Sequence, residues 1–316
     1  MRIAIVGAGI MGRMLAWRLA PQHDVIVYDA DLSGQHSAAW AAGGMLSPTA
    51  ELMQADQTLY QLASASLALW HTWFALHHDA IGWQQQGSVL MAHRHDHADL
   101  QHQVGRIRKV LGAGADQHIV QREDLQYFLP KEACVDVRKV LAFLGQAPVQ
   151  WHEQRIDHID AVAKTVDVCI DCRGYHLDSA FADLRAVRGE LLYVHAPEVN
   201  IAQPIRLIHP RYPIYLIPRG DGVYVIGASE IEADDRSPMS VRTCMELLGA
   251  AYGVDPGFAE ARMIEMAVGL RPALPSNHPE IQQTGNIIAV NGLYRHGFLL
   301  APILAQQVEE RLHDYA

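Results

Sequence analysis

A glycine-rich turn close to the N-terminus constrains the fold of this chain more than any other feature. An apolar run from Arg2 to Val6 leads directly into GAGIMG at positions 7–12, and apolar residues at helical spacing follow. A second apolar run then ends in an acid, Asp29. This order of strand, glycine turn, helix, strand and acid predicts the first βαβ unit of a Rossmann-type dinucleotide-binding domain. In such a unit Asp29 is placed to accept hydrogen bonds from an adenosine ribose.

The residues of the turn have separate roles in this unit. Gly7 permits the tight turn, Gly9 lets the backbone approach a pyrophosphate, and Gly12 lets the helix pack close to the strand. Ile10 and Met11 stand at the helix N-terminus, where free N–H groups and the helix dipole favour an anion. The agreement of these features favours a ligand site over a glycine turn without a ligand. It does not separate NAD from FAD, because both present an ADP half to the same turn.

Length and composition indicate an enzyme-sized globular protein. The chain has 316 residues and is 50% hydrophobic, which is enough for a full core in two domains or one large one. A net charge of -10 argues against nonspecific nucleic-acid binding, which needs clustered cations, although it leaves room for a local cationic pocket. The N-terminus lacks the pattern of a secretory signal, and no apolar run approaches the roughly 20 residues of a membrane span. We therefore expect a cytoplasmic protein without a membrane span.

Two groups of metal-ligating residue types favour a structural explanation. Cys169 and Cys172 form a C-x-x-C, but they lie in the apolar run from Val166 to Cys172, so buried core thiols are favoured over a redox or metal pair. Four histidines between His93 and His102 stand among acids and an arginine, which is typical of a solvated surface before a helix. No metal site is predicted.

The rest of the chain predicts a discontinuous cofactor domain. Residues 37–48 are small and glycine-rich, so their backbone can pass close to a flat ring. A long amphipathic helix is expected from Glu51 to about His78, a helix from Arg138 to Leu144, and strands from Val149 to Ile159 and from Val166 to Cys172. The last of these, ending at a glycine, returns the chain to the cofactor sheet.

An antiparallel sheet is expected in the second half of the chain. Residues 214–219 and 223–227 alternate like strands around the tight turn Gly220 to Gly222. The predicted fold class is therefore α/β, with a Rossmann-type cofactor-binding domain and an inserted antiparallel-sheet substrate domain. The predicted ranges are 1–80, 136–180 and 268–316 for the cofactor domain, and 81–135 and 181–267 for the substrate domain.

The closing region carries two arginines on short, rigid elements. Arg271 stands between apolar residues, and Arg295 lies in a turn between a strand at 286–290 and a helix from Phe298 onward. A buried arginine needs an anionic partner, because leaving it unpaired costs several kcal/mol. A substrate carboxylate matches the planar guanidinium, and an internal Asp or Glu is the alternative partner for each arginine.

Taken together, these motifs resemble the D-amino-acid oxidase superfamily, and within it the glycine oxidases of thiamine biosynthesis. The motifs span nearly the whole chain in family order: GAGIMG at 7–12, AAWAAGGMLSP at 38–48, YLIPR at 215–219, GAS at 227–229, GLRP at 269–272 and GLYRHGFLLAP at 292–302. One departure is DCRG at 171–174, where many relatives have a short Ala/Thr-Gly run. For that reason no flavin contact is assigned to this strand.

The resemblance implies noncovalently bound FAD and a set of site residues. Gly44 and Met45 would lie near the reactive edge of the flavin, and Gly297 to Leu300 near its pyrimidine edge. Arg271 would clamp the substrate carboxylate, Tyr215 would donate a hydrogen bond to it, and Arg295 would be a second pocket residue. The cofactor-binding residues expected are Gly7, Gly9, Ile10, Met11, Gly12, Asp29, Gly43, Gly44, Met45, Arg295, His296, Gly297, Phe298, Leu299 and Leu300.

The resemblance also implies a chemistry. The α-hydrogen of a small amino acid would leave as a hydride to the flavin N5, which needs positioning and a dry pocket but no general base. Imine hydrolysis would then yield a 2-oxo acid and ammonia, glyoxylate in the case of glycine, with oxygen or another acceptor taking the electrons. The alternatives are oxidation of sarcosine or a small D-amino acid, a nicotinamide-dependent dehydrogenase, and an FAD-bearing accessory protein. Dimers and tetramers occur in the family, so a homo-oligomer stays open.

Overall fold

The N-terminal βαβ unit forms where the sequence predicts it. In the computed structural model, which describes residues 1–123, 125–176, 178–211 and 213–312, strand β1 (Arg2–Val6) lies parallel to β2 (Asp24–Asp29), with helix α1 (Ile10–Leu19) between them. The strands are covered on both faces, and Ile3, Ala4 and Ile5 have no exposed surface. This burial explains their continuous apolar sequence.

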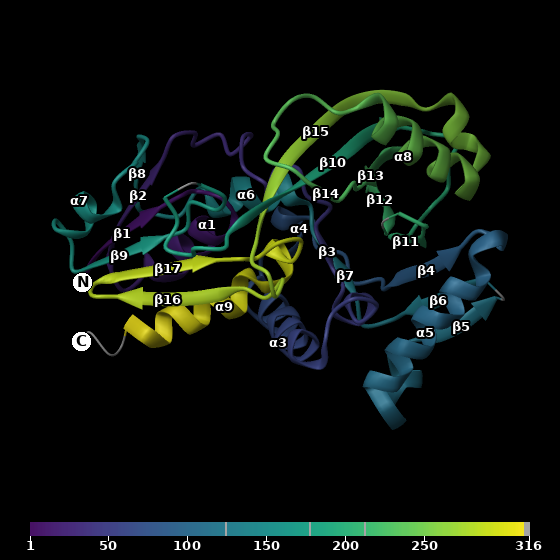
Figure 1. Ribbon diagram of the computed structural model, residues 1–316, viewed down its shortest axis with the longest axis horizontal. Coiled ribbons are helices and arrows are strands. Elements are labelled where there is room, and N and C mark those ends of the chain that lie inside the picture. The colour runs from purple at the N-terminus through teal and green to yellow at the C-terminus, as the bar shows by residue number, and fades with distance from the viewer. Residues whose placement is uncertain (124, 177, 212, 313–316) are drawn as a thin grey trace.

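Segments far apart in the sequence complete a six-stranded sheet in the order β16-β17-β9-β1-β2-β8. Strands β8 (Gln150–Glu153), β9 (Val168–Asp171) and β17 (Ile287–Asn291) join it in parallel, and β16 (Glu280–Thr284) pairs antiparallel with β17. The chain therefore leaves this sheet and returns to it, as expected for a discontinuous cofactor domain. Figure 1 shows the sheet in one half of the molecule, beside both chain termini.

Two predicted elements differ in extent from those observed. The strand predicted from Val149 to Ile159 ends at Glu153, and helix α7 (Ile159–Ala163) begins at its predicted last residue. Residues 152–155 are exposed at the sheet edge, so no apolar face extends the strand. The single helix predicted from Glu51 to His78 is interrupted, because the Asp56 side chain accepts a hydrogen bond from the Leu59 N–H and starts a new helix. The helices of this region are α2 (Pro48–Glu51), α3 (Gln57–Trp73) and α4 (His78–Ile81).

Helices cover the cofactor sheet with an apolar core. Helix α9 (Gly297–Leu312) contacts both α1 and α3, and α6 (Val137–Leu144) packs on α1 and α4. Trp70 and Phe74 are fully buried in this core, and the Trp70 indole donates to the Phe298 carbonyl oxygen at 2.8 Å. The long aromatic helix is therefore part of the core rather than a wall of a site.

The second sheet has nine strands and joins residues from two separate segments of the chain. Its neighbours are antiparallel except for β4 and β11, which are parallel. The predicted pair around the turn at 220–222 is confirmed as β12 (Ile214–Gly220) and β13 (Val223–Gly227). The other strands are β4 (Ser88–Ala92), β5 (Val120–Glu123), β6 (Gln126–Leu129), β10 (Arg185–His195), β11 (Ile205–Ile208), β14 (Ile231–Glu232) and β15 (Arg262–Ala273).

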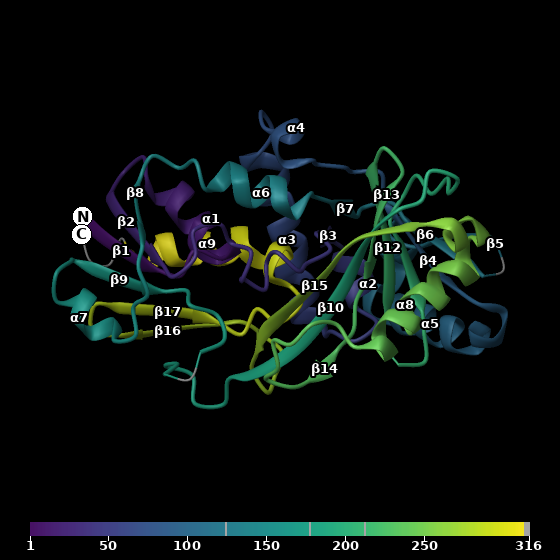
Figure 2. The same cartoon turned by 90° about the horizontal axis from the view of Figure 1, so that it is seen from above.

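Strands β10 and β15 run from the second sheet toward the first, as Figures 1 and 2 show. Strand β15 is continuous across the proposed domain boundary between residues 267 and 268, so the exact boundary remains a proposal. Helices α5 (His97–Leu111) and α8 (Val241–Val254) pack on the second sheet. The short elements are β3 (Met45–Leu46), paired with β7 (Ala133–Cys134), and the 3-10 helices η1 (Arg94–Asp96), η2 (Gly112–Gln117) and η3 (Pro256–Glu260).

The cysteine and histidine motifs lie in ordinary structural positions. Cys169 and Cys172 are buried as free thiols, and burial raises the pKa of Cys169 to about 12. His95, His97 and His102 are exposed on η1 and α5. Within the described ranges, no three His, Cys, Asp or Glu residues gather in a way that could hold a metal ion. None of the helices described there combines the length and the apolar character needed to cross a membrane.

Candidate active site

A single cavity joins the glycine turn to the inner face of the second sheet. Its wall includes Gly7, Gly9 and Asp29 at the carboxyl ends of β1 and β2, and Tyr215 and Arg271 from β12 and β15. In an open α/β sheet, ligands bind outside the carboxyl ends of the strands. The structure therefore brings most of the predicted cofactor residues and the predicted substrate residues to one continuous space.

The three glycines of the turn meet different surroundings. A Cβ at Gly7, whose φ is +105°, would lie 2.4 Å from the Cys172 carbonyl oxygen, and a Cβ at Gly12 would lie 1.8 Å from the Gly7 carbonyl oxygen. Backbone packing thus requires these two glycines. A Cβ at Gly9 would meet nothing within 4 Å among the described residues, and Gly9 lines the cavity. The free space in front of Gly9 is where backbone could approach a bound pyrophosphate.

Helix α1 begins in a way that leaves its first N–H groups available. Its N-cap, Gly9, makes no side-chain cap, and its first turn has no acid. The Asp29 carboxylate at the end of β2 accepts from the N–H groups of Ala8 and, at 2.9 Å, Asp31. Asp29 is therefore held at the cavity wall by the same turn that would receive an anion.

Arg13 supports this turn from behind, a role that the sequence analysis missed. Its guanidinium is buried and donates to the carbonyl oxygens of Ala8 at 2.7 Å, Leu32 at 2.6 Å and Leu141 at 3.1 Å. Burial lowers its pKa, and the charges of Asp29 and Asp31 partly oppose that shift. The available signal was an arginine inside the otherwise apolar run of residues 10–16.

The two glycines predicted to pass close to a ring pack against different parts of the protein. A Cβ at Gly43 would lie 2.8 Å from the Tyr215 ring, and a Cβ at Gly44, whose φ is +72°, would lie 2.3 Å from the Val135 carbonyl oxygen. Arg219 donates to the Gly43 carbonyl oxygen at 2.6 Å and fastens this segment to β12. Gly43, Gly44 and Met45 all line the cavity.

Arg271 faces the cavity without an acidic partner among the residues that the structure describes. Its guanidinium donates to the Ser229 carbonyl oxygen at 3.0 Å, and it lies so close to β10 that a Cβ at Gly189 would be 2.3 Å from Nη2. Tyr215 lines the same part of the cavity, and burial raises its pKa to about 12 against the opposing charge of Arg271. Both side chains thus offer hydrogen-bond donors to an anion.

The other buried or half-buried arginines of the cavity are paired with carboxylates. Arg173 lies 2.8 Å from Asp171, Arg206 lies 3.1 Å from Glu51, and Arg295 lies 2.8 Å from Glu51. Arg295 therefore has an acid of the protein as its partner, which was the alternative to a substrate carboxylate. Its side chain still lines the cavity.

Glu51, at the end of α2, is the acid that the two arginines share. Burial alone would raise its pKa, but the charges of Arg295 and Arg206 lower it to about 2. Sequence reasoning assigned it only to the start of a helix, because nothing in the spacing relates residue 51 to residues 206 and 295.

Four of the predicted cofactor residues lie behind the cavity wall. They are Gly12, His296, Leu299 and Leu300. His296 is 3% exposed, with Nδ1 3.5 Å from Glu51, and burial lowers its pKa to about 4. Direct ligand contact by these four residues remains a prediction, and their position suits them to support the wall. Conversely, Cys172, Arg173 and Gly174 line the cavity, although no contact was assigned to them.

The comparisons with known proteins settle the family. A family model described as FAD dependent oxidoreductase, abbreviated DAO, matches residues 2–311. The chain belongs to this family. It is an FAD-dependent oxidoreductase, and the alternative of a nicotinamide-dependent dehydrogenase is excluded.

Relatives of known name and solved structures agree with this assignment. The putative thiamine biosynthesis oxidoreductase ThiO of Rhizobium etli is 36% identical over 329 residues, covering 99% of this chain and 96% of the relative. The crystal structure of glycine oxidase from Bacillus cereus ATCC 14579 matches with a TM-score of 0.80 at 22% identity, covering 99% of this chain and 97% of that one. Iminodiacetate oxidase from Chelativorans sp. BNC1 matches with a TM-score of 0.79 at 21% identity, covering 96% and 93%. At such identities the structural likeness concerns the fold.

The cavity of this DAO-family enzyme fits its cofactor. The uncapped start of α1, the open space in front of Gly9 and the carboxylate of Asp29 suit the diphosphate and the adenosine ribose of FAD. Gly43 and Gly44 line the same cavity and pack against Tyr215 and Val135, so a side chain at either position would displace these contacts. These residues would hold FAD.

Two cavity residues that the sequence analysis did not single out stand beside Arg295. The Tyr294 hydroxyl donates to Glu230 Oε1, and Glu230 Oε2 lies 3.5 Å from Arg295 Nη1. Burial raises the pKa of Tyr294, and the Glu230 charge adds to that shift. Glu230 directly follows the GAS motif, so its position was visible, but sequence spacing could not rank it as a pocket residue.

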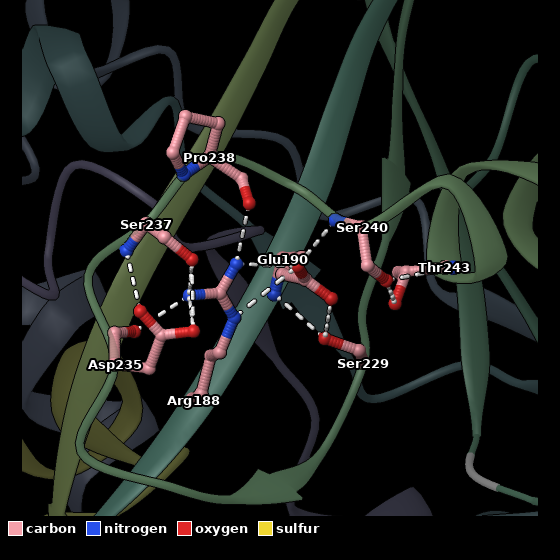
Figure 3. A network of polar contacts seen from close by, with 8 residues as sticks. All are labelled: Arg188, Glu190, Ser229, Asp235, Ser237, Pro238, Ser240 and Thr243. Atoms are coloured by element: carbon pink, nitrogen blue, oxygen red, sulfur yellow. Dashed lines mark hydrogen bonds and ion pairs between the residues drawn. The ribbon is translucent and has the colours of Figure 1, made fainter.

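A buried polar network, shown in Figure 3, holds the segment from which Glu230 projects. Glu190 on β10 is fully buried; its N–H donates to Ser229 Oγ at 3.0 Å, and its Oε2 accepts from that hydroxyl at 3.0 Å. Arg188 donates to Glu190 at 2.7 Å and to the carbonyl oxygens of Asp235 at 2.6 Å and Pro238 at 2.9 Å. Since the Ser229 carbonyl oxygen accepts from Arg271, the network also supports the proposed carboxylate clamp.

Proposed function

We propose that this enzyme oxidises the C–N bond of a small amino acid, with glycine as the leading substrate. Glycine would yield glyoxylate, ammonia and, with oxygen as acceptor, hydrogen peroxide. The observation that carries the proposal is Arg271, a cavity arginine with a backbone carbonyl oxygen but no acid as its partner in the described part of the chain. A cation held this way is ready for the carboxylate of a substrate.

The residues of the chain would act by positioning. Arg271 would bind the substrate carboxylate through two parallel N–H donors, and the Tyr215 hydroxyl would donate to the same group. Gly43 and Gly44, which line the cavity, would lie beside the flavin and help to keep the α-carbon close to it. When bound, FAD supplies the acceptor for the α-hydrogen and its electron pair. Water would then hydrolyse the resulting imino acid to the 2-oxo acid and ammonia.

The names of relatives support glycine and the thiazole branch of thiamine synthesis. The Rhizobium etli relative is named for thiamine biosynthesis and covers almost the whole chain. Sarcosine and small D-amino acids stay as alternative substrates, because a methyl group or two changes binding by only about 1 to 3 kcal/mol. An FAD-bearing accessory protein without turnover is the remaining alternative. A cytoplasmic location and a homo-oligomer belong to the same proposal.

The test is a substrate panel on the FAD-loaded protein. Glycine, sarcosine and D-alanine are supplied separately, and peroxide release is measured beside reduction of an artificial dye, which separates an oxidase from a dehydrogenase. We expect Arg271→Ala to lower kcat/KM for the best substrate by about 100-fold or more, because a charged hydrogen-bond partner is lost. Arg262→Ala is the matched control, since Arg262 lies on the same strand with 74% of its side chain exposed. Unchanged kcat/KM in Arg271→Ala would refute the clamp, and a panel without turnover would favour the accessory protein.

A further inference from the structure

The arginines around Arg271 do not form a site for anions of any charge, because acids of the cavity contact two of them. Five arginines are among the described residues that line the cavity; Arg173 pairs with Asp171 and Arg236 is exposed, which leaves Arg206, Arg271 and Arg295. Two of the acids that line the cavity, Glu51 and Glu230, contact arginines of this group. Glu51 contacts Arg206 at 3.1 Å and Arg295 at 2.8 Å, and Glu230 lies 3.5 Å from Arg295. Two of the three positive charges are therefore balanced within the protein, and one is left for a ligand.

Glu230 is held toward the cavity by the structure around it. The Tyr294 hydroxyl donates to one of its carboxylate oxygens, and Arg295 faces the other. The preceding residue, Ser229, is fastened to Glu190 through its N–H at 3.1 Å and its hydroxyl at 3.0 Å. Arg188 fastens the loop again at Asp235 and Pro238. The carboxylate of Glu230 is thus held in a fixed position, even though 32% of its side chain remains exposed.

Glu230 also stands next to the group that would bind the substrate. The Ser229 carbonyl oxygen, one residue away, accepts from Arg271 at 3.0 Å. Any part of a substrate that extends from Arg271 toward Arg295 therefore meets a carboxylate. A second carboxylate there would lie beside a like charge in a partly desolvated site, which weakens its binding.

Building on the proposed function, we infer that Glu230 restricts this enzyme to amino acids with a single carboxylate by cancelling the charge of Arg295. Arg271 accepts the one carboxylate that the substrate needs. Without the Glu230 charge, Arg295 would be a second anion site. Specificity of this kind comes from repulsion of the wrong ligand rather than from new contacts to the right one.

The kinetic test uses pairs of substrates that differ by one carboxylate. Sarcosine is compared with iminodiacetate, and D-alanine with D-aspartate. In the wild type, we expect kcat/KM to favour the monocarboxylate of each reactive pair. Glu230→Gln should reduce this preference at least about tenfold, whereas Glu230→Asp should keep it, because only the first change removes the charge. Glu232→Gln is the control, since Glu232 lies two residues away, pairs with Arg185 and does not line the cavity.

A binding test separates failure of this inference from failure of the proposed function. Calorimetry on the FAD-loaded protein gives the Kd values of acetate and malonate, which also differ by one carboxylate. We expect Glu230→Gln to tighten malonate relative to acetate by at least about tenfold. If no amine is turned over but this shift occurs, the proposed function fails, whereas the exclusion of a second carboxylate by Glu230 stands. An unchanged malonate-to-acetate ratio in Glu230→Gln overturns the inference, and so does a wild type that oxidises iminodiacetate as well as sarcosine.

Discussion

Two arginines of the same sequence context have different partners in this protein. Arg271 and Arg295 both follow apolar residues near the C-terminus, and both line the cavity. Arg295 contacts Glu51, which it shares with Arg206, at 2.8 Å and Glu230 at 3.5 Å, whereas Arg271 contacts only a backbone carbonyl oxygen in the described structure. The available anion, and not the residue type, therefore decides which arginine is open to a substrate.

At this scale the acidity of Glu51 has a measurable consequence. Its pKa is lowered from 4.5 to about 2, so the ionised carboxylate stabilises the folded state above pH 4.5, and this contribution is lost as the pH falls toward 2. We expect Glu51→Gln to lower the free energy of unfolding at pH 7 by about 3 kcal/mol, because two buried arginines lose their partner. Denaturant unfolding of the FAD-loaded protein at pH 7 and pH 3.5 measures the effect.

The difference between Glu51→Gln and wild type should shrink at the lower pH, since the wild-type carboxylate is then contributing less. Glu260→Gln is the control, because 74% of its side chain is exposed. Equal stability of Glu51→Gln and wild type at pH 7 would show that the carboxylate does not hold the two arginines.

At the scale of an element, the turn between β1 and α1 combines a packing requirement with a ligand requirement. Gly12 is needed because α1 touches the Gly7 carbonyl oxygen, whereas Gly9 has open space where a side chain would be. The same short motif thus contains residues that serve folding and a residue that serves binding. Substitution by alanine should separate the two roles.

We expect Gly9→Ala to leave the unfolding midpoint of the FAD-free protein unchanged and to weaken FAD binding at least about tenfold, because the added methyl group faces the cavity. Gly12→Ala should lower that midpoint instead, since a Cβ 1.8 Å from a backbone oxygen forces α1 away from the sheet. Thermal unfolding without FAD and fluorescence titration with FAD measure both effects. A Gly9→Ala protein with wild-type FAD affinity would contradict the assignment of the pyrophosphate to this turn.

At the scale of the whole molecule, strands β10 and β15 connect the half with the six-stranded cofactor sheet to the half with the nine-stranded sheet. Arg271 lies on β15, and the Arg188 and Glu190 pair, which Figure 3 shows, lies on β10. The pair fastens the loop that carries Ser229 and Glu230 to the strand next to Arg271. The proposed carboxylate site is thus formed by two long strands and by the loop that Arg188 and Glu190 hold in place, not by one local motif.

This arrangement predicts that breaking the Arg188–Glu190 ion pair makes the loop after Ser229 more accessible to a protease. Glu190→Gln removes the buried charge partner of Arg188 and leaves it only Asp235, whose side chain is half exposed, so we expect the free energy of unfolding to fall by about 3 kcal/mol. We also expect cleavage by trypsin after the exposed Arg236 to become at least about tenfold faster, because the loop opens more often. Mass spectrometry of a limited digest measures the rate. Glu280→Gln, at an exposed position of β16, is the control. An unchanged cleavage rate in Glu190→Gln would contradict the role of the Arg188–Glu190 pair in holding the loop.

The sequence by itself determined the local units of this protein. The glycine turn, the helix after it and the strand pair around residues 220–222 form where predicted, because neighbouring residues determine their backbone. The family resemblance, which the family model confirms, rests on such short motifs. The strand predicted from Val149 was too long, because its last residues are exposed at an edge that only the sheet defines.

Only the tertiary structure decided how the charges of the cavity pair. Arg295 and Glu51 are separated by 244 positions in the chain, and Tyr294 and Glu230 by 64. Hydrophobic periodicity and turn residues report on contacts within an element, whereas these ion pairs form between elements brought together by the sheets. For this reason the open state of Arg271, the neutralised Arg295 and the placement of Glu230 emerge only from the folded chain.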